Sequence, residues 1–528
     1  MSELALDYVS PLPPVRTGIA DYSLDLLPHL EPLCDLRVVR VPGQPVEKSV
    51  RERWALVRAD QLGEAGRTAL FHMGNNHHHL EIARLAMSHP GVLVLHDLVL
   101  HHFLLGRTVG EDDTHAYFRR IKLEHGWIGL DAAHAVRWGA FGDSLQFALP
   151  AHRSLVRRQR GLIVHSEWAR GTLLEEEPDL TVRVVPMGIP LPKRVNPERS
   201  RAFRESLGIP SAAPLLGAFG FQTPMKRPKV AIQALSSEKL AHVHLIVGGE
   251  VAPTLELEKA IEEAELSDRV HVTGFLDYDT FEAAIAACDL CLNLRYPTAG
   301  ETSAALLRVL ALGRPTLVSD YAQFADLPSD AAVRVPLGDG EIEALTSSVA
   351  SLLAEPARLA SMGEAARSYI RDQHAPPMAA QAVVDACSEL GRLDPPDRKP
   401  LRVPPPTSMA YRKLDGELEV TGHEAPWPDG ERRTLRVRLT NTGAATWLGG
   451  GRGAGGVALQ LVLLSRGEDL LADQAWPALS CDLAPGESEE FEILVRRPLG
   501  PARLRVEPHV LGASGFNVLG GPTWESEI

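Results

Sequence analysis

The residues of this chain that could do chemistry gather where strands are expected to end. Residues 293–320, NLRYPTAGETSAALLRVLALGRPTLVSD, predict a strand end, a polar loop, an amphipathic helix and a second strand. Around the start of that helix stand Gly300, Glu301, Thr302 and Ser303. A glycine loop that feeds a helix amino terminus presents free N–H groups and the positive end of the helix dipole to an anion. Glu-Thr-Ser is also an ordinary helix cap, so this stretch alone leaves both functions open.

A second segment that could bind an anion, GFQTPMKRP, follows an apolar strand predicted at 214–220. Gly220 ends the strand, and Lys226 and Arg227 supply two cations a few residues later. Adjacent cations at a strand end could neutralise a diphosphate. The same residues are equally consistent with a basic turn that is exposed to solvent and binds nothing.

Polar segments also follow three predicted strands in the first part of the chain. Their candidate residues are Arg16, Gly18 and Asp21 in the first segment, Asn75, Asn76 and His79 in the second, and His96, Asp97 and His101 in the third. A histidine beside an aspartate at a strand end suits acid–base work or the binding of sugar hydroxyls. The adjacent histidines at 77–79 favour a metal only weakly, because neighbouring side chains point in different directions. We therefore expect no metal site.

Two α/β halves must position these segments. The first half runs to about Pro190 and the second begins near Pro214, and short apolar runs alternate with helical stretches in both. The predicted strands are 4–9, 69–73, 91–95, 161–164 and 182–185, then 214–220, 243–247, 270–272, 290–292, 316–319 and 332–335. Ligands bind such sheets at the carboxyl ends of the strands. We therefore expect the polar segments to face one cleft, with Pro186–Pro190 as the hinge.

The last part of the chain changes its pattern. An apolar-faced helix is predicted at 378–390, and the stretch DPPDRKPLRVPPP is typical of a semi-rigid linker. Alternating strands and glycine-rich turns then predict an all-β domain, most simply an immunoglobulin-like sandwich with a buried Trp447. The predicted domains are 1–190 together with helix 378–390, 191–377, a linker at 391–410, and the sandwich at 411–528.

Composition limits the function classes. The chain has 528 residues and a formal net charge of −14, which argues against a broad nucleic-acid footprint. There is no signal-peptide pattern and no apolar run of the roughly 18 to 20 residues that a membrane span needs. The five cysteines are scattered, and Cys288 and Cys291 are expected to be packing residues. These features favour a cytoplasmic protein, with peripheral contact to the inner face of the membrane as an open alternative.

Together the segments resemble the retaining, nucleotide-sugar-dependent glycosyltransferases of family 4, which have the GT-B fold of two Rossmann-like halves. The resemblance covers roughly residues 5–390 and follows the family's order. It rests on PLPPVRTGIADYS, HMGNNHHH, LVLHDLVLHH, IVHSEWA, VVPMGIP, GFQTPMKRP, VHVTGF and YPTAGETSAALLRVLALGRPTLVSD. The GNN and LHD segments look like a bacterial branch. The resemblance implies hexosyl transfer from a nucleoside diphosphate sugar to a glycan or glycolipid acceptor, as in polysaccharide biosynthesis, without a cofactor or metal ion.

The resemblance also implies roles for individual residues. Lys226 should contact the donor diphosphate, the Thr302 and Ser303 amides should surround it, and Gly18 should face it across the cleft. Gly274 and Phe275 should lie near the nucleobase. The other donor-side residues would be Gly220, Arg227, Gly300, Glu301 and Arg308. The acceptor side would be Arg16, Asp21, Asn75, Asn76, His79 and His101. The residues expected at the reacting centre are His96, Asp97, Lys226 and Glu301.

Two features depart from the family pattern. The family's two glutamates, eight positions apart, fall on Gly300 and Arg308, which leaves Glu301 displaced by one place. A guanidinium cannot accept hydrogen bonds from ribose hydroxyls, so Arg308 could instead pair with phosphate or with an acid of its own domain. The family's arginine before the phosphate lysine is replaced by Phe221, and Arg227 is the candidate that could compensate.

Two other classes of function stay open. One is a different enzyme on the same fold, a nucleotide-sugar epimerase or a glycoside phosphorylase. The other is a degenerate GT-B module that binds glycan or scaffolds a complex without turnover. The sandwich could bind carbohydrate, contact a partner protein or brace the enzyme, and the sequence does not rank these roles.

Overall fold

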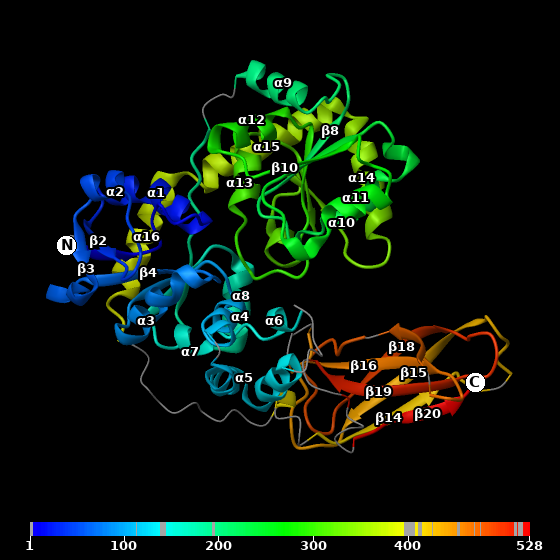
Figure 1. The fold of residues 1–528 in the computed structure, drawn as a ribbon. Coiled ribbons are helices and arrows are strands. Elements are labelled where there is room, and N and C mark those ends of the chain that lie inside the picture. The colour runs from blue at the N-terminus through cyan, green and yellow to red at the C-terminus, as the bar shows by residue number, and fades with distance from the viewer. Residues whose placement is uncertain are drawn as a thin grey trace. The chain divides into compact units, whose positions relative to one another are not determined.

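The computed structural model describes residues 4–111, 113–137, 144–192, 196–394, 407–409, 414–424, 426–450, 455–468, 470–475, 477–511, 515 and 521–528. Most of the predicted proline-rich linker, residues 395–406, lies outside the described residues. The chain forms two compact units (Figure 1). The first contains Met1–Leu98 and Leu155–Pro396, and the second contains Val99–Ser154 and Asp397–Ile528. The prediction of two Rossmann-like α/β halves followed by β structure is confirmed.

The first half of unit 1 is a parallel sheet with the strand order β3-β2-β1-β4-β5-β6-β7. The strands are β1 (Ala5–Val9), β2 (Asp35–Arg40), β3 (Leu56–Arg58), β4 (Thr68–Met73), β5 (Val92–Leu95), β6 (Gly161–Val164) and β7 (Val182–Val184). The helices are α1 (Gly18–Leu30), α2 (Lys48–Arg53), α3 (Leu80–Ser88), α8 (Glu167–Glu176) and, from the end of the unit, α16 (Pro376–Leu390). The sequence did not reveal β2 and β3, because one alternates charged with apolar residues and the other has three residues.

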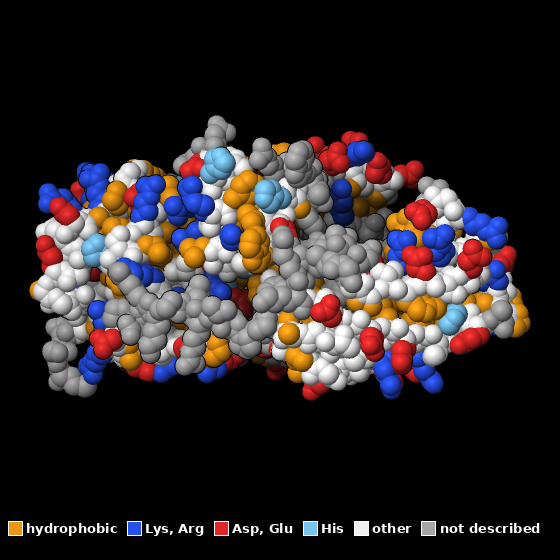
Figure 2. All heavy atoms as spheres, turned by 90° about the horizontal axis from the view of Figure 1, so that it is seen from below, with side chains coloured by type: hydrophobic (Ala, Val, Ile, Leu, Met, Phe, Trp, Pro, Cys, Tyr) orange, Lys and Arg blue, Asp and Glu red, His pale blue; other side chains and the backbone are white. Residues whose placement is uncertain are grey.

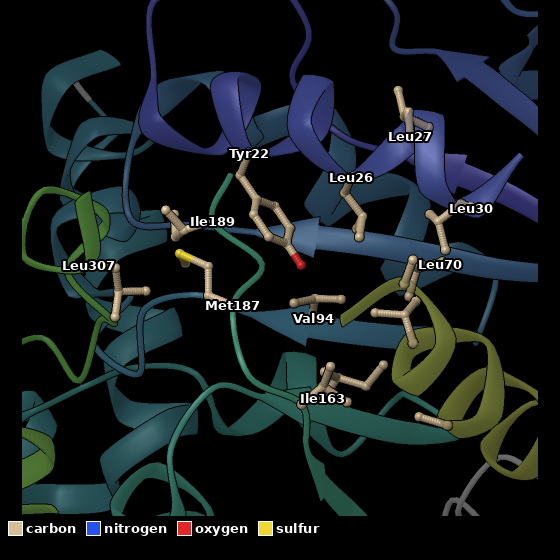
Figure 3. Packing of buried hydrophobic residues seen from close by; sticks show 14 of the residues in the cluster. Tyr22, Leu26, Leu27, Leu30, Leu70, Val94, Ile163, Met187, Ile189 and Leu307 are labelled. Carbon is tan, nitrogen blue, oxygen red and sulfur yellow. The ribbon is translucent and has the colours of Figure 1, made fainter. Parts of the chain in front are cut away.

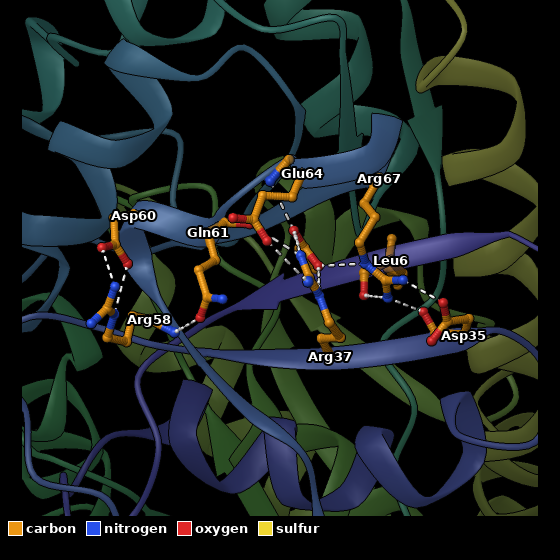
Figure 4. Close-up of polar contacts among 10 residues, drawn as sticks. Leu6, Asp35, Arg37, Arg58, Asp60, Gln61, Glu64 and Arg67 are labelled. Carbon is orange, nitrogen blue, oxygen red and sulfur yellow. Dashed lines mark hydrogen bonds and ion pairs between the residues drawn. The ribbon is translucent and has the colours of Figure 1, made fainter.

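A buried carboxylate of β1 is bound by one arginine from β2 and by another that stands just before β4; Figure 4 labels these arginines, Arg37 and Arg67. Asp7 of β1 is fully buried and accepts two hydrogen bonds from Arg37 of β2, at 2.8 and 3.0 Å. Arg67, just before β4, donates to it at 2.7 Å, and the amide of Gly63 does so at 2.9 Å. Burial alone would raise the pKa of Asp7, but these hydrogen bonds outweigh it and hold the pKa below its usual value. These two ion pairs therefore tie β1 to β2 and to the start of β4.

The second half of unit 1 is a parallel sheet with the strand order β10-β9-β8-β11-β12-β13. The strands are β8 (Leu215–Phe219), β9 (His244–Gly248), β10 (Val270–Gly274), β11 (Leu290–Asn293), β12 (Thr316–Ser319) and β13 (Ala332–Val335). The helices are α9 (Pro197–Ser206), α10 (Pro228–Leu235), α11 (Leu257–Glu263), α12 (Tyr278–Ala287), α13 (Ala304–Ala311), α14 (Glu341–Leu353) and α15 (Pro356–Gln373). The strand order reverses between β8 and β11, as it does between β1 and β4 in the first sheet, and ligands bind at such switch points.

The helix α16 closes the first half. Its buried face belongs to the same apolar cluster as α1 and the first sheet, and a Cβ on Gly161 of β6 would lie 2.6 Å from a methyl of Leu390. Figure 3 shows Tyr22 and Leu26 of α1 directed toward Val94 of the sheet. Cys288 and Cys291 are buried beside Phe219 and α12, which confirms that they are packing residues.

Unit 2 combines a helical segment with two antiparallel sheets. The helices are α4 (His101–Gly106), α5 (Thr114–Arg137), α6 (Ser144–Ala148) and α7 (Arg153–Val156), the last of which continues into unit 1. The sheets have the orders β14-β15-β18 and β17-β16-β19-β20. Their strands are β14 (Gly416–Thr421), β15 (Arg432–Asn441), β16 (Val457–Leu464), β17 (Leu470–Ala475), β18 (Ser488–Arg496), β19 (Arg503–Val510) and β20 (Trp524–Glu527). Trp447 is fully buried, as predicted.

The described part of the surface carries both signs of charge (Figure 2). On the face in Figure 2, acidic and basic side chains are both present. On β15 and β18 of unit 2 they form cross-strand pairs, such as Arg436 with Glu492 at 3.3 Å. Within the described residues, no helix has the length and apolar character needed to cross a bilayer.

Candidate functional site

The first part of the site is the turn that follows β8. Lys226 ends a short 3₁₀ turn, and its ammonium donates to the carbonyl of Phe219 at 3.1 Å. Gly220 has a φ of +97°, and a Cβ there would lie 2.4 Å from Nζ of Lys226, so a larger residue would strain the backbone and displace the ammonium. Burial and the charge of Arg295 lower the pKa of Lys226 to about 7, although Glu301 opposes the shift.

The second part is the loop between β11 and α13. Nη1 of Arg295 lies 2.6 Å from Oε1 of Glu301, and the arginine side chain is 11% exposed. The other oxygen of Glu301 accepts hydrogen bonds from the Thr298 hydroxyl and the Ala299 amide, both at 3.0 Å. Glu301 is therefore engaged with its own loop and with Arg295.

The helix α13 begins where the sequence predicts. Ser303 is its N-cap, and the serine hydroxyl accepts from the amide of Leu306 at 3.2 Å. Among the residues that the structure describes, the amides of Thr302 and Ser303 have no hydrogen-bond partner. Gly300 has a φ of +79°, and a Cβ there would lie 2.6 Å from Cγ of Leu98. The free amides give this helix start the character of an anion site.

Asp97 follows β5 and lies against this loop. The amide of Leu98 donates to the carbonyl of Ala299 at 2.7 Å, and the Asp97 carboxylate accepts from the amide of Asn75 at 2.8 Å. Burial, together with the nearby Glu301, raises the pKa of Asp97 to about 7. A carboxyl group that titrates near neutral pH can exchange a proton under working conditions, which suits an acid–base role.

His96 lies in a chain of buried histidines. The Nδ1–H of His165 must donate to the carbonyl of Val185, at 2.7 Å, because a carbonyl only accepts. His165 Nε2 then accepts from Nδ1 of His96 at 3.2 Å, and His96 Nε2 accepts from Nδ1 of His72 at 3.0 Å. Burial and the mutual repulsion of these rings lower the pKa of His96 well below its usual value. Both nitrogens of His96 are therefore occupied by other histidines.

Arg308 pairs with an acid of the other α/β half. Its Nη2 lies 3.0 Å from Oδ2 of Asp25 in α1, and its Nη1 donates to the hydroxyl of Tyr278 at 3.1 Å. The sequence suggested that Arg308 would pair with phosphate or with an acid of its own domain. In the structure its partner is instead Asp25, an acid of the other half. Asp21, one helical turn before Asp25, has a pKa raised by burial, with Arg308 opposing the shift.

Arg227, the predicted compensating cation, is engaged elsewhere. It has a left-handed backbone, with φ of 56°, and its guanidinium makes two contacts with the carboxylate of Glu341 at the start of α14. The distance from its Nε to Oε1 of Glu341 is 2.8 Å. This ion pair leaves the side chain anchored to its own half.

The predicted nucleobase segment is open to solvent. Gly274 ends β10 with a φ of +67°, and the ring of Phe275 is 65% exposed. The guanidinium of Arg16 lies 5.9 Å from the centre of that ring, within cation–π range. Gly18 is the first residue of α1.

The remaining acceptor-side candidates have structural partners. The side-chain oxygen of Asn76 accepts from the amide of His78 and from Nδ1 of His79, both at 3.0 Å. His79 is fully buried, which lowers its pKa to about 3. His101 belongs to unit 2, where it is buried and bonded to the Tyr117 hydroxyl at 2.8 Å.

Sequence reasoning missed Arg295, His72 and His165 as members of these clusters. Arg295 was visible in the loop before Glu301, but only the fold shows that the two side chains meet. His72 lies within β4 and His165 follows β6, and their convergence depends on strand order. No group of His, Cys, Asp and Glu suited to a metal ion occurs among the described residues.

Comparison with known proteins supports a glycosyltransferase. Residues 200–369 match the family model described as Glycosyl transferases group 1. A 2-deoxystreptamine glucosyltransferase from Streptomyces kanamyceticus is 24% identical over 244 residues, which are 44% of this chain and 61% of that protein. The chain therefore spans less than two thirds of the length of this relative.

Solved structures agree on the architecture. Sucrose-phosphate synthase from Thermosynechococcus elongatus superimposes with a TM-score of 0.52 at 15% identity, over 73% of this chain and 99% of the other. The fold is GT-B. Anabaena HepE, in complex with UDP and glucose, gives a TM-score of 0.52 at 16% identity, over 73% of this GT-B chain and 100% of its own. At these identities the likeness shows the fold alone.

Proposed function

We propose that this chain transfers a sugar from a nucleoside diphosphate sugar to a hydroxyl of a glycan, glycolipid or related acceptor, with retention at the anomeric carbon. The observation that carries the proposal is the arrangement at the switch point of the second sheet. The Lys226 ammonium follows β8, and the free amides of Thr302 and Ser303 follow the neighbouring β11. Both lie within the part of the chain that matches Glycosyl transferases group 1.

These groups suit the departure of a diphosphate. As the bond from sugar to diphosphate breaks, negative charge grows on the leaving group, and fixed cations and amides stabilise it. A lysine and a helix start can supply the positive charge for this step, so we propose that turnover needs no divalent metal and persists in EDTA. Asp97, with a pKa of about 7, lies on the first-half side of the same loop.

UDP-glucose is the donor to test first. The solved structure of HepE contains UDP and glucose, and the Streptomyces relative is named as a glucosyltransferase. Donor identity nevertheless rests on the nucleobase and ribose contacts of this chain. Arg308 departs from the family pattern at the expected ribose position, so other nucleotides belong in the same screen.

The experiment is a thermal-shift screen against UDP, GDP, ADP, dTDP and CMP, alone and as sugar donors. A ligand that binds only the folded protein adds about 2.7 kcal/mol at a hundredfold excess over its dissociation constant. We expect one nucleotide to raise the melting temperature, and Lys226→Ala to abolish the shift. Lys229→Ala is the matched control, because Lys229 is exposed on the next helix.

The outcomes separate the alternatives. Acceptor-dependent release of nucleoside diphosphate supports the transferase. Hydrolysis or epimerisation of donor without acceptor would favour a different enzyme on this fold. No shift from any nucleotide would contradict the proposal and favour a module without turnover.

A further inference from the structure

We propose that Arg295, held in place by Glu301, is the second cation of the diphosphate site and acts beside Lys226. This inference rests on the proposed function. The resemblance to family 4 places Phe221 where that family carries an arginine, so a second cation would have to come from elsewhere. The structure assigns that position to an arginine from the neighbouring strand end.

Backbone contacts bring the two cations to the same place. β8 and β11 are paired in parallel, so the loops that leave their carboxyl ends meet at one edge of the sheet. The amide of Tyr296 donates to the carbonyl of Met225 at 2.8 Å, which joins the residues next to Arg295 and Lys226. The amide of Arg295 also donates to the hydroxyl of Ser319 at 2.9 Å. The arginine therefore starts from a fixed backbone position.

The side chain of Arg295 has unused hydrogen-bonding capacity. Its Nη1 is bound to Glu301, but its buried Nε has no partner among the described residues. A buried guanidinium N–H without an acceptor is unfavourable, and an oxygen of a bound diphosphate would satisfy it. The repulsion between Arg295 and Lys226, which contributes to the low pKa of the lysine, would be relieved by the same anion.

The other arginines suggested by the sequence are committed to acids. Arg227 is bound to Glu341, and Arg308 is bound to Asp25. Glu301 is instead a positioning residue, because its carboxylate holds Arg295 with one oxygen and its own loop with the other. The displaced glutamate thus has a role that differs from direct contact with a sugar hydroxyl.

The reaction step explains why two cations matter. The bond from the anomeric carbon to the diphosphate oxygen breaks, and its electron pair stays on the diphosphate. The acceptor oxygen bonds to the anomeric carbon, and its proton passes to the departing diphosphate. Arg295 and Lys226 would stabilise the charge that develops on the leaving oxygens.

The test uses inorganic pyrophosphate and UDP as probes in calorimetric titrations of the full chain. Pyrophosphate reports on the cation site whatever the nucleobase specificity. We expect Arg295→Gln to weaken pyrophosphate binding about tenfold to a hundredfold, the range for hydrogen bonds to charged groups. Arg295→Lys should retain part of the affinity. Arg314→Gln is a matched control, because Arg314 also has a buried unpartnered Nε but follows the carboxyl end of α13.

A pH series distinguishes direct action from a general loss of structure. Wild-type binding should weaken as pH rises above about 7, where Lys226 loses its proton. Removing the charge of Arg295 should move this fall to higher pH, because one cause of the low lysine pKa is gone. Glu301→Gln should move it to lower pH, because Glu301 opposes that shift.

The results also separate this inference from the proposed function. If the wild type binds neither pyrophosphate nor any nucleotide of the panel, the proposed function fails and the inference fails with it. If the wild type binds and Lys226→Ala does not, but Arg295→Gln binds as well as Arg314→Gln, only the inference is overturned. Melting temperatures of all variants identify any loss of folding. If Arg295→Gln does not fold, Arg295→Lys replaces it in the test: because the lysine keeps the charge, its binding should fall with pH as in the wild type and should retain part of the affinity.

Discussion

At the scale of single residues, a chain of three buried imidazoles in the first half constrains the protonation state of its members. His72, His96 and His165 are joined by hydrogen bonds that start at one backbone carbonyl. Each ring donates from Nδ1 and the next ring accepts at Nε2, so all three can be neutral at once. Protonation of His96 or His165 would add an N–H group at Nε2, and that group would then face the N–H group of the neighbouring ring. The folded protein therefore favours the neutral form of the whole chain.

This arrangement predicts acid-sensitive stability. Burial first, and neighbouring rings second, lower the pKa of His72 and His96, while burial lowers that of His165 to about 4. Between about pH 4 and 6.5 the unfolded chain binds more protons than the folded one, so stability falls as pH falls through that window. Each such histidine contributes a slope of up to about 1.4 kcal/mol per pH unit.

Denaturant unfolding at a series of pH values would measure this slope. His72→Asn keeps a donor toward His96 but does not titrate, so we expect a shallower slope between pH 6.5 and 5. The exposed His242 supplies the control, and His242→Asn should leave the slope unchanged. An identical slope in His72→Asn would show that the buried chain is not the source.

The sequence located residues whose role is local. Ser303 caps α13 and Gly220 makes room for Lys226, and both effects are decided within a few positions of the chain. The partners of Arg308 and Arg227 were not predictable, because Asp25 and Glu341 lie 283 and 114 positions away. Which acid pairs with which arginine depends on how the helices pack against each other. The periodicity of apolar residues in the sequence does not contain this information.

At the scale of elements, the close approach of two loops depends on a single glycine. Gly300, with φ of +79°, brings the loop after β11 against Leu98, which follows β5. The strands themselves were largely predictable because buried parallel strands are continuous apolar runs. The strands β2 and β3 were not, because β2 mixes charged and apolar residues and the edge strand β3 has only three residues.

The loop contact predicts a large effect of Gly300→Ala. A non-glycine residue in the left-handed region costs about 1–2 kcal/mol. At Gly300 the new Cβ would also lie 2.6 Å from Cγ of Leu98, so the loop must shift. Gly338→Ala is the matched control, because Gly338 has a φ of +89° and open space around it.

We therefore expect Gly300→Ala to destabilise the protein more than Gly338→Ala and to weaken nucleotide binding, which the control should preserve. Unfolding curves and titrations of both variants measure the two effects. Equal stability and equal affinity of the two variants would mean that the contact with Leu98 is unimportant.

At the scale of the whole molecule, the antiparallel sheets share their unit with a helical segment that comes much earlier in the chain. Residues 99–154 interrupt the first α/β half and form one compact unit with residues 397–528. One apolar cluster contains Tyr117, Ile121 and Ile128 of α5 together with Trp447 and Val506 of the sheets. The sequence predicted a sandwich at 411–528 after a linker, and most of that linker, residues 395–406, lies outside the described residues.

This shared core predicts the result of truncation. A chain that ends at residue 394 keeps the cluster of α1, α16 and the first sheet, but it loses the sheet side chains that share an apolar cluster with α5. Exposed apolar surface costs about 25 cal/mol per Å² and makes a segment easier to unfold locally. We expect limited proteolysis of the truncated chain to cut first within residues 101–137, while the full chain resists cleavage there. If instead both chains show the same cleavage pattern, the helical segment is stable without the sheets, and the sheets form an independent domain.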